Sequence, residues 1–398
     1  MIDKVTNKSN INTLMKNNMR SYSMIIILAI IIVMFAVFTG GNSLSPRNFS
    51  IIFFVYGYIL ILAVGMAQVI IVRGIDLSVG SVCAFVGALS VMIYNTGIGM
   101  PVTLLASLAI GVGIGAFQGM WIAFAKVPAF IVTIAGMFMF RALAYIVLNL
   151  TGLRPIDIGY TYLATGILDE VLSVGRVGPY YPVSFLVAVL VLVVFIISGF
   201  LGRKKRIAND FKVTSLPFFV AKLIIICLLL LGLAERFARY RGVPIVVLVI
   251  GVTVVLIHYI LNYTVLGRYI YAVGGNPNSA KLSGINSEFV TFTVFCFMGG
   301  LTGLAAVVYT GSMNLALPQA GNLFELDTIA ACYIGGISVS GGIGTVFGVV
   351  VGGLIMAFIN NGMSLLNFGT YNQAVVKALV LLAAVVYDIY SRRKAGLG

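Results

Sequence analysis

The sequence is poor in charged residues and in histidine. Only 9% of its 398 residues are charged and 61% are hydrophobic, whereas about 25% of the residues of a soluble domain are charged. A chain of this composition cannot hide its apolar surface from water, which excludes a soluble protein. The single histidine, His258, lies in an apolar segment without a Cys, His or acidic neighbour. We therefore expect it to pack or to hydrogen-bond with a neighbouring helix, and not to ligate a metal.

The sequence also lacks the motifs of an enzyme. It contains no G-x-x-x-x-G-K-[ST] phosphate-binding motif, so the chain does not cradle ATP itself. No paired carboxylates, no nucleophile with a base and no metal cluster stand out, and we predict no catalysis, no cofactor and no metal. All four cysteines fall inside apolar runs, which predicts buried small hydrophobic residues without disulfides: Cys83, Cys227, Cys296 and Cys332.

Long apolar runs dominate the chain. Since a membrane span requires about 20 mainly apolar residues, we predict an all-α, polytopic transmembrane helical bundle of about 10–12 spans. Residues 21–390 form this membrane domain, between cytoplasmic tails at 1–20 and 391–398. The run 24–38 is followed by no A-x-A-like cleavage site and is predicted to be an uncleaved first span. The candidate spans are residues 21–39, 51–72, 78–94, 102–125, 130–150, 182–201, 216–233, 243–261, 287–309, 326–337, 345–359 and 375–390.

The net charge of +14 is distributed as in a membrane protein. With the N-terminus placed in the cytoplasm, 17 basic residues fall in or beside cytoplasmic loops and 6 fall outside. Short cytoplasmic loops carry an excess of Lys and Arg, so both termini are predicted to be cytoplasmic, and no nucleic-acid partner is expected. The outer cluster Arg236, Arg239 and Arg241 fits only if residues 216–233 cross the membrane.

Two glycine-rich breaks resemble each other. Residues 74–80 read G-I-D-L-S-V-G and residues 336–342 read G-I-S-V-S-G-G, sharing G-I-x-[LV]-S-x-G. Backbone at membrane depth must be buried in protein or line water, and such breaks in corresponding halves point to a transport pathway. We therefore take Asp76, Ser78, Ser338 and Ser340 as pathway candidates and expect the adjoining third and tenth runs to be short. A chance match is the alternative, and for Asp76 a helix cap is the first interpretation.

Other polar residues lie at the ends of spans. Asn360 and Asn361 end the eleventh run, where their amides can serve sugar hydroxyls as donors and acceptors or cap the helix. Glu325 and Asp327 are expected to place negative charge at a helix start.

Polar and small residues also occur inside the spans. Arg141 and Lys377 are expected to reach the interface or to pair within the bundle. Gln118 is expected to join neighbouring helices. Glycines spaced four apart predict close helix packing at residues 111, 115 and 119 and at residues 344, 348 and 352.

Two long loops are candidate docking regions. The inner loop 262–286 holds the turn cluster G-G-N-P at 274–277. After it, Asn278 or Ser279 can cap a short helix at 280–282 that Gly284 ends. This helix either rests in a groove of a cytosolic partner or is an ordinary surface helix. The outer loop 151–181 either meets a soluble partner or is a passive excursion.

Four motifs resemble the permease subunits of bacterial monosaccharide ABC importers of the ribose, galactose and xylose type. They are R-G-I-D-L-S-V-G-S (73–81), K-V-P-A-F-I-V-T-I-A-G-M (126–137), G-R-Y-I-Y-A-V-G-G-N-P-N-S-A-K-L-S-G-I-N (267–286) and E-L-D-T-I-A-A-C-Y-I-G-G-I-S-V-S-G-G-I-G-T (325–345), the last followed by N-N-G-M-S-L-L (360–366). The extra length at 209–243, with R-Y-R-G-V-P at 239–244, resembles the xylose or multiple-monosaccharide branch.

The resemblance implies an assembly. It implies a homodimer of this chain, two cytosolic ATPase subunits that use ATP, and an external sugar-binding protein that delivers a monosaccharide. It also implies that the inner loop holds the coupling helix, with these candidate residues: Gly274, Gly275, Asn276, Ala280, Leu282, Ser283 and Gly284.

Other functions stay open at this point. An ion-coupled secondary transporter would require acidic residues near the membrane midplane, and Asp76 gives it thin support. A membrane-embedded enzyme would require clustered catalytic residues. Within the same family, permeases for nucleosides, branched-chain amino acids or signalling furanones are closer alternatives.

Overall fold

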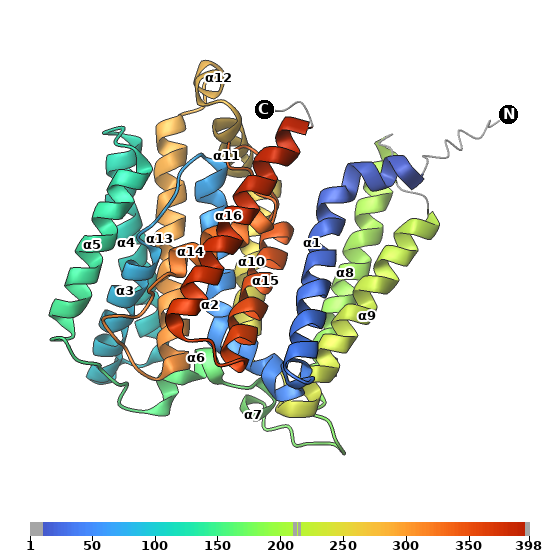
Figure 1. Ribbon diagram of the computed structural model, residues 1–398, viewed down its shortest axis with the longest axis horizontal. Coiled ribbons are helices and arrows are strands. Elements are labelled where there is room, and N and C mark those ends of the chain that lie inside the picture. Colours follow the sequence, from blue (N-terminus) through green and yellow to red (C-terminus); the bar gives the residue numbers. More distant parts are fainter. Residues whose placement is uncertain (1–10, 210–212, 214–215, 395–398) are drawn as a thin grey trace.

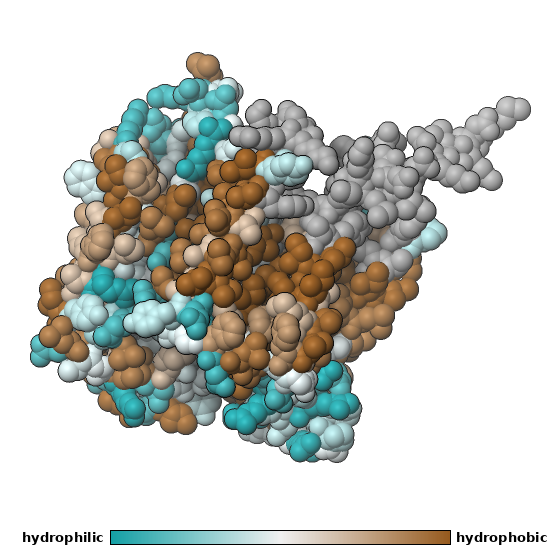
Figure 2. All heavy atoms as spheres, in the orientation of Figure 1, coloured by the Kyte–Doolittle hydropathy of each residue, from teal (hydrophilic) through white to brown (hydrophobic). Residues whose placement is uncertain are grey.

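The computed structural model describes residues 11–209, 213 and 216–394 and confirms an all-α architecture (Figure 1). Over these residues the backbone forms helices and three isolated β-bridges, with no strand. Within the same part of the chain, nine helices are long and apolar enough to cross a membrane. Figure 2 shows hydrophobic side chains around the middle of the visible face and hydrophilic ones gathered at its two ends. This distribution is the one that a bilayer imposes.

Every predicted run contains a helix. The helices are α1 (Ile11–Phe38), α2 (Pro46–Ile71), α3 (Val79–Ile93), α4 (Met100–Ala123), α5 (Ala129–Val147), α6 (Tyr162–Thr165), α7 (Leu168–Val171), α8 (Val183–Ala208), α9 (Leu216–Tyr240), α10 (Ile245–Tyr263), α11 (Val265–Gly275), α12 (Pro277–Leu282), α13 (Ser287–Met313), α14 (Phe324–Ile334), α15 (Val346–Leu365) and α16 (Thr370–Lys394). Short η1 (Asn42–Leu44), η2 (Tyr94–Ile98) and η3 (Ile158–Thr161) complete them.

The bundle has two ends, which we name the α12 side and the α7 side. In Figure 1, α12 and α11 lie at one end, and α6 and α7 lie at the other. Helix α1 begins and α16 ends on the α12 side. The described chain therefore passes between the two sides an even number of times.

Side-chain caps set where several helices begin. The hydroxyl of Ser45 accepts the N–H of Asn48 at the start of α2, and Pro46 occupies the first turn. The side chain of Thr345 accepts the N–H of Gly348 at the start of α15. Such caps satisfy backbone donors that have no partner inside the helix. They place the helix starts at the two polar ends of the bundle.

Helix α14 is too short to cross alone, as expected for the tenth run, whereas α3 continues into η2 and Val79–Ile98 together are long enough to cross, so the expectation of a short third run is wrong. Helix α14 has 11 residues, which is roughly 16 Å of helix against a hydrocarbon core of about 30 Å. Segments 72–78 and 314–323 carry the chain to the first residues of α3 and α14 without helix. The two starts meet in mid-bundle, where an added methyl group at Gly80 would collide with the Gly321 carbonyl oxygen.

The second predicted break lies elsewhere than expected. Gly342 donates its N–H to the carbonyl of Ile71 at 2.9 Å, so residues 335–345 lie beside the last turn of α2, on the α12 side. The non-helical segment that precedes α14 is instead 314–323, which sequence reasoning did not identify. A single glycine, Gly321, marks it near its end. Glycine content alone therefore located one mid-bundle break and missed the other.

The predicted glycine-lined helix contacts are confirmed on α4 and α15, except that Gly344 precedes α15 and does not belong to its helix face. A methyl group at Gly111 on α4 would collide with the Gly299 carbonyl oxygen on α13, and one at Gly115 with that of Phe295. On α15, a methyl group at Gly352 would collide with the carbonyl oxygen of Ala331 on α14. Small residues let helix backbones approach this closely where no hydrophobic driving force separates protein from lipid.

The α8–α9 hairpin and the outer loop are packed against the bundle. Helix α9 is continuous over 25 residues, and its Phe237 ring lies 5.5 Å from that of Phe53 on α2. In the outer loop, Tyr160 is fully buried and its hydroxyl bonds that of Ser90 at 2.5 Å. The loop also pairs Leu153 with Ala316. These contacts hold this part of the loop against the bundle, and its two interpretations, docking of a soluble partner or a passive excursion, stay predictions.

Candidate functional site

Segment 72–78 is held in place by a polar network. The Asp76 carboxylate accepts the N–H of Ser78 at 2.8 Å and its hydroxyl at 2.7 Å. The Ser78 hydroxyl is also 2.9 Å from the amide nitrogen of Gln118 on α4. Thr133 on α5 donates to the carbonyl of Ile75 at 3.2 Å. Asp76 therefore caps the turn that leads into α3, and Gln118 joins this turn to α4.

Segment 314–323 is held in place by an arginine side chain from another helix. Arg141 on α5 donates to the carbonyls of Pro318 at 2.6 Å and Ala320 at 2.5 Å. Of its two predicted roles, reaching the interface or pairing within the bundle, Arg141 has the second, and it satisfies backbone carbonyls that no helix satisfies. Glu325, in the first turn of α14 as expected, has a carboxylate oxygen 3.1 Å from where a methyl group at Gly80 would lie. The two broken segments therefore meet among charged and backbone polar groups.

A buried ion pair joins α14 to α16. The Lys377 ammonium lies 2.8 Å from the Asp327 carboxylate, and the two side chains are 12% and 0% exposed. Asn360 on α15 donates to the other carboxylate oxygen at 3.2 Å. Lys377 thus pairs within the bundle, which was one of its two predicted roles. Asp327 lies in the first turn of its helix, as predicted.

The second asparagine of the pair has a different partner. Asn361 and Asn48 exchange two side-chain hydrogen bonds, of 2.8 Å and 3.0 Å, and both residues are buried. This contact ties the end of α15 to the start of α2. The side-chain amide oxygen of Asn360, in contrast, is buried without a hydrogen-bond partner among the described residues.

Ser338 and Ser340 belong to the loop on the α12 side. The Ser338 hydroxyl accepts the N–H of Ser340 at 3.1 Å, and the Ser338 N–H donates to the carbonyl of Ile343 at 3.0 Å. Ser338 is buried, whereas Ser340 is exposed. The six pathway candidates thus lie at three separate locations: Asp76 with Ser78, the loop that holds Ser338 and Ser340, and the last two turns of α15, which hold Asn360 and Asn361.

The inner loop forms two helices. Helix α12 is Pro277–Leu282 and its cap is Asn276, whose side chain accepts the N–H groups of Asn278 and Ser279, both at 3.0 Å. The prediction that Asn278 or Ser279 caps a helix at 280–282 is therefore wrong by one turn, because Pro277 supplies the first helical residue and Asn276 precedes it. Gly284 has a φ of 81° and follows the helix end, as expected.

The two faces of α12 differ. Ala280 is buried, whereas Leu282 is 90% exposed. The Ser283 hydroxyl donates to the carbonyl of Ser279 at 2.9 Å and closes the helix end. A fully exposed leucine on a short polar helix is available to a partner and makes no contribution to this chain's own core.

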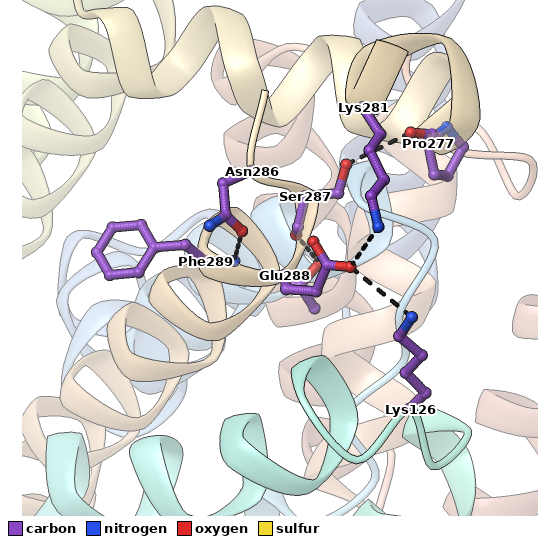
Figure 3. A network of polar contacts seen from close by, with 8 residues as sticks. Lys126, Pro277, Lys281, Asn286, Ser287, Glu288 and Phe289 are labelled. Atoms are coloured by element: carbon purple, nitrogen blue, oxygen red, sulfur yellow. Dashed lines mark hydrogen bonds and ion pairs between the residues drawn. The ribbon is translucent and has the colours of Figure 1, made fainter. Parts of the chain in front are cut away.

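Figure 3 shows how α12 connects to its neighbours. The Glu288 carboxylate at the start of α13 lies 3.4 Å from Lys281 on α12 and 3.8 Å from Lys126 in the α4–α5 turn. The Ser287 hydroxyl donates to the carbonyl of Pro277 at 3.4 Å. The two lysine side chains are mostly exposed, and exposed ion pairs contribute about 0–1 kcal/mol. These contacts orient α12 without holding it strongly.

The structure offers no reaction chemistry. Among the described residues, no group of three or more His, Cys, Asp or Glu side chains could hold a metal ion. An apolar groove of about 290 Å³ lies between α4 and α5, with Gln118 and Trp121 in its lining. Several of the polar groups described above join neighbouring helices by hydrogen bonds or an ion pair, as Asn48 with Asn361 and Asp327 with Lys377 do.

The comparison with protein families decides the class of the molecule. The model of the branched-chain amino acid transport system / permease component family matches residues 48–213 and 208–385. The chain belongs to this permease family. It is therefore the membrane permease subunit of an ABC transporter, and it is not itself an enzyme.

Curated relatives of this permease are sugar permeases. It is 37% identical to the xylose transport system permease protein of Haemophilus influenzae, over 95% of this chain and 98% of that protein. It is 36% identical to the xylose transport system permease protein of Escherichia coli K12, over 95% and 94%. The ribose import permease protein of the same strain is 33% identical, over 82% and 81%. No solved structure matches the permease.

Proposed function

We propose that this permease is the membrane subunit of an ATP-driven importer for a monosaccharide of the xylose type. Two copies form the translocation pathway, an external binding protein delivers the sugar, and cytosolic ATPase subunits bind α12. The partners use the ATP, and this chain takes no cofactor. The observation that carries the proposal is α12 itself, a short capped helix between the end of α11 and the start of α13, on which Leu282 is 90% exposed.

The distribution of charge supports a cytoplasmic position for α12. Basic residues follow or occupy helix ends on its side: Arg73, Lys126, Arg203, Lys204, Lys205, Arg268 and Lys281. On the α7 side, the outer cluster is partly neutralised, because Arg239 pairs with Glu235 and Arg241 pairs with Glu170. Since short cytoplasmic loops are enriched in Lys and Arg, the α12 side faces the cytoplasm.

The polar groups near the broken segments suit a neutral cargo. Ser78, Gln118 and Asn360 are hydroxyl and amide groups that can both donate and accept hydrogen bonds. Sugar hydroxyls require such groups. The relatives that carry xylose and ribose in their names support a pentose.

The exposed leucine of α12 gives a direct test. We expect Leu282→Asp to abolish binding of the ATPase subunits, because a buried leucine anchor at a helix-in-groove contact is replaced by a charge. Binding and sugar-stimulated ATP hydrolysis are measured with the permease in nanodiscs and its ATPase and binding protein added. Ala280 is a poor probe because it is buried against this chain.

The matched control is Leu172→Asp on the α7 side, where a leucine is also exposed; it should bind the ATPase normally. Normal ATPase binding by Leu282→Asp would reject α12 as the docking helix. Uphill uptake by the permease alone, driven by a proton or sodium gradient, would reject the whole proposal in favour of an ion-coupled transporter. If leucine stimulates ATP hydrolysis by the assembly and xylose does not, the cargo is an amino acid and not a sugar.

A further inference from the structure

The inner loop 262–286, which we now call the coupling loop, contacts the chain next to both glycine-rich breaks, 74–80 and 336–342, through a junction of packed backbone. The Gly342 N–H donates to the Ile71 carbonyl at 2.9 Å. A methyl group at Gly274 would collide with that same carbonyl oxygen and would lie 2.8 Å from the Gly342 nitrogen. No side chain therefore separates the end of α2, the end of α11 and loop 335–345. Since packed backbone cannot compress or change rotamer, a displacement of one segment displaces the others.

Arg73 holds this junction together. Its Nε donates to the Gly274 carbonyl at 2.7 Å and its Nη2 donates to the Gly275 carbonyl. These are the last two carbonyls of α11, which have no partner within their helix and carry its negative dipole end. The φ of Arg73 is 68°, a left-handed conformation that is uncommon for a residue other than glycine. The chain accepts this conformation at the point where the guanidinium reaches across to α11.

The junction leads directly to the broken segments. Arg73 lies near the start of segment 72–78, which continues through Asp76 and Ser78 to the first residue of α3. On its other side, Tyr271 of α11 donates to the carbonyl of Gly344 at 2.9 Å, just before α15 begins. The other link of α12, through Glu288 in Figure 3, uses exposed lysine side chains. Arg73 is also exposed, but its two bonds go to backbone carbonyls of α11 and not to a second mobile side chain.

We infer that Arg73 is the positioning residue that transmits movement of the coupling loop to segment 72–78. When an ATPase moves α12, the guanidinium makes α11 and the start of segment 72–78 move as one body, and the pathway near Asp76 changes with them. Arg73 touches neither ATP nor sugar in this role. The inference rests on the proposed function, since it assigns a path to the coupling that the function requires.

The test is to remove the guanidinium and keep the backbone. Asparagine tolerates the left-handed conformation, so Arg73→Asn removes the two hydrogen bonds without new strain. In proteoliposomes with the ATPase and binding protein, we expect sugar transported per ATP to fall about tenfold, while ATPase binding and ATP turnover stay near the wild-type values. Arg73→Lys, which keeps the charge but not the two-pronged donor, should be intermediate. Arg154→Asn, an exposed arginine on the α7 side, is the control and should change neither value.

A second measurement separates transmission from stability. With the native cysteines replaced by alanine, spin labels at Asn278→Cys on α12 and Met92→Cys on α3 report the distance between the two elements. In the otherwise unchanged permease, we expect this distance to stay constant when nucleotide is added, and in Arg73→Asn to change. Wild-type sugar transport per ATP in Arg73→Asn would overturn the inference alone. If the unaltered assembly shows no coupling between ATP and sugar, the proposed function fails with it.

Discussion

Replacing Lys377 by methionine would remove the cation from an ion pair inside the bundle. Its ammonium lies 2.8 Å from the carboxylate of Asp327, which is completely buried, whereas the lysine side chain is 12% exposed. The methionine keeps the apolar stem, so the change tests the charge. The carboxylate would keep only its 3.2 Å hydrogen bond from Asn360. Breaking a buried pair by removing one partner costs about 3–5 kcal/mol, because the other charge is left uncompensated.

We expect the stabilities of three variants to differ in a definite order. Lys377→Met should lower the free energy of unfolding by about 3–5 kcal/mol. Asp327→Asn should cost less, because the long lysine side chain can reach more polar surroundings when its partner is lost. The double variant should recover at least about 2 kcal/mol relative to Lys377→Met, since both charges are then absent.

The assay is reversible unfolding of the purified permease in mixed micelles, with denaturing detergent as the variable. Lys204→Met is the control, because Lys204 is exposed at the end of α8, and it should change stability by less than about 0.5 kcal/mol. If Lys377→Met is as stable as this control, or if the double variant is no better than the single one, the ion pair does not hold α14 to α16.

Two further changes test the packing. Gly111→Ala should destabilise the bundle by about 1–3 kcal/mol, because the added methyl group meets the α13 backbone. The control Gly113→Ala, on the same helix with open space around it, should be neutral or stabilising. Equal effects of the two substitutions in thermal unfolding would contradict the α4–α13 contact. Asn361→Leu should cost about 1–3 kcal/mol, because the buried Asn48 Oδ1 loses its donor while the Asn48 amide nitrogen keeps its bond to the Ser43 carbonyl. Replacing both asparagines by leucine should restore part of that loss in the same measurement.

Local sequence determined which segments are helices and which of their faces are lined by small residues. The twelve apolar runs each hold a helix, because hydrophobic length is a property of a continuous stretch of chain. The glycine spacing on α4 and α15 likewise identified contact faces, since residues four apart lie on one helix face. The G-G-N-P cluster located the turn before α12, although the cap itself was placed one turn too late. These features depend on neighbours within a few residues.

Tertiary structure alone decided which polar groups meet. Asn48 and Asn361 are 313 residues apart in the chain, Arg73 and Gly274 are 201 apart, and Asp327 and Lys377 are 50 apart. No pattern in one sequence pairs residues at such separations, because the pairing depends on how the helices are arranged. The break at 314–323 escaped notice for a related reason. Its backbone carbonyls are satisfied by Arg141 from α5, so the segment does not require the glycines that mark the break at 74–80.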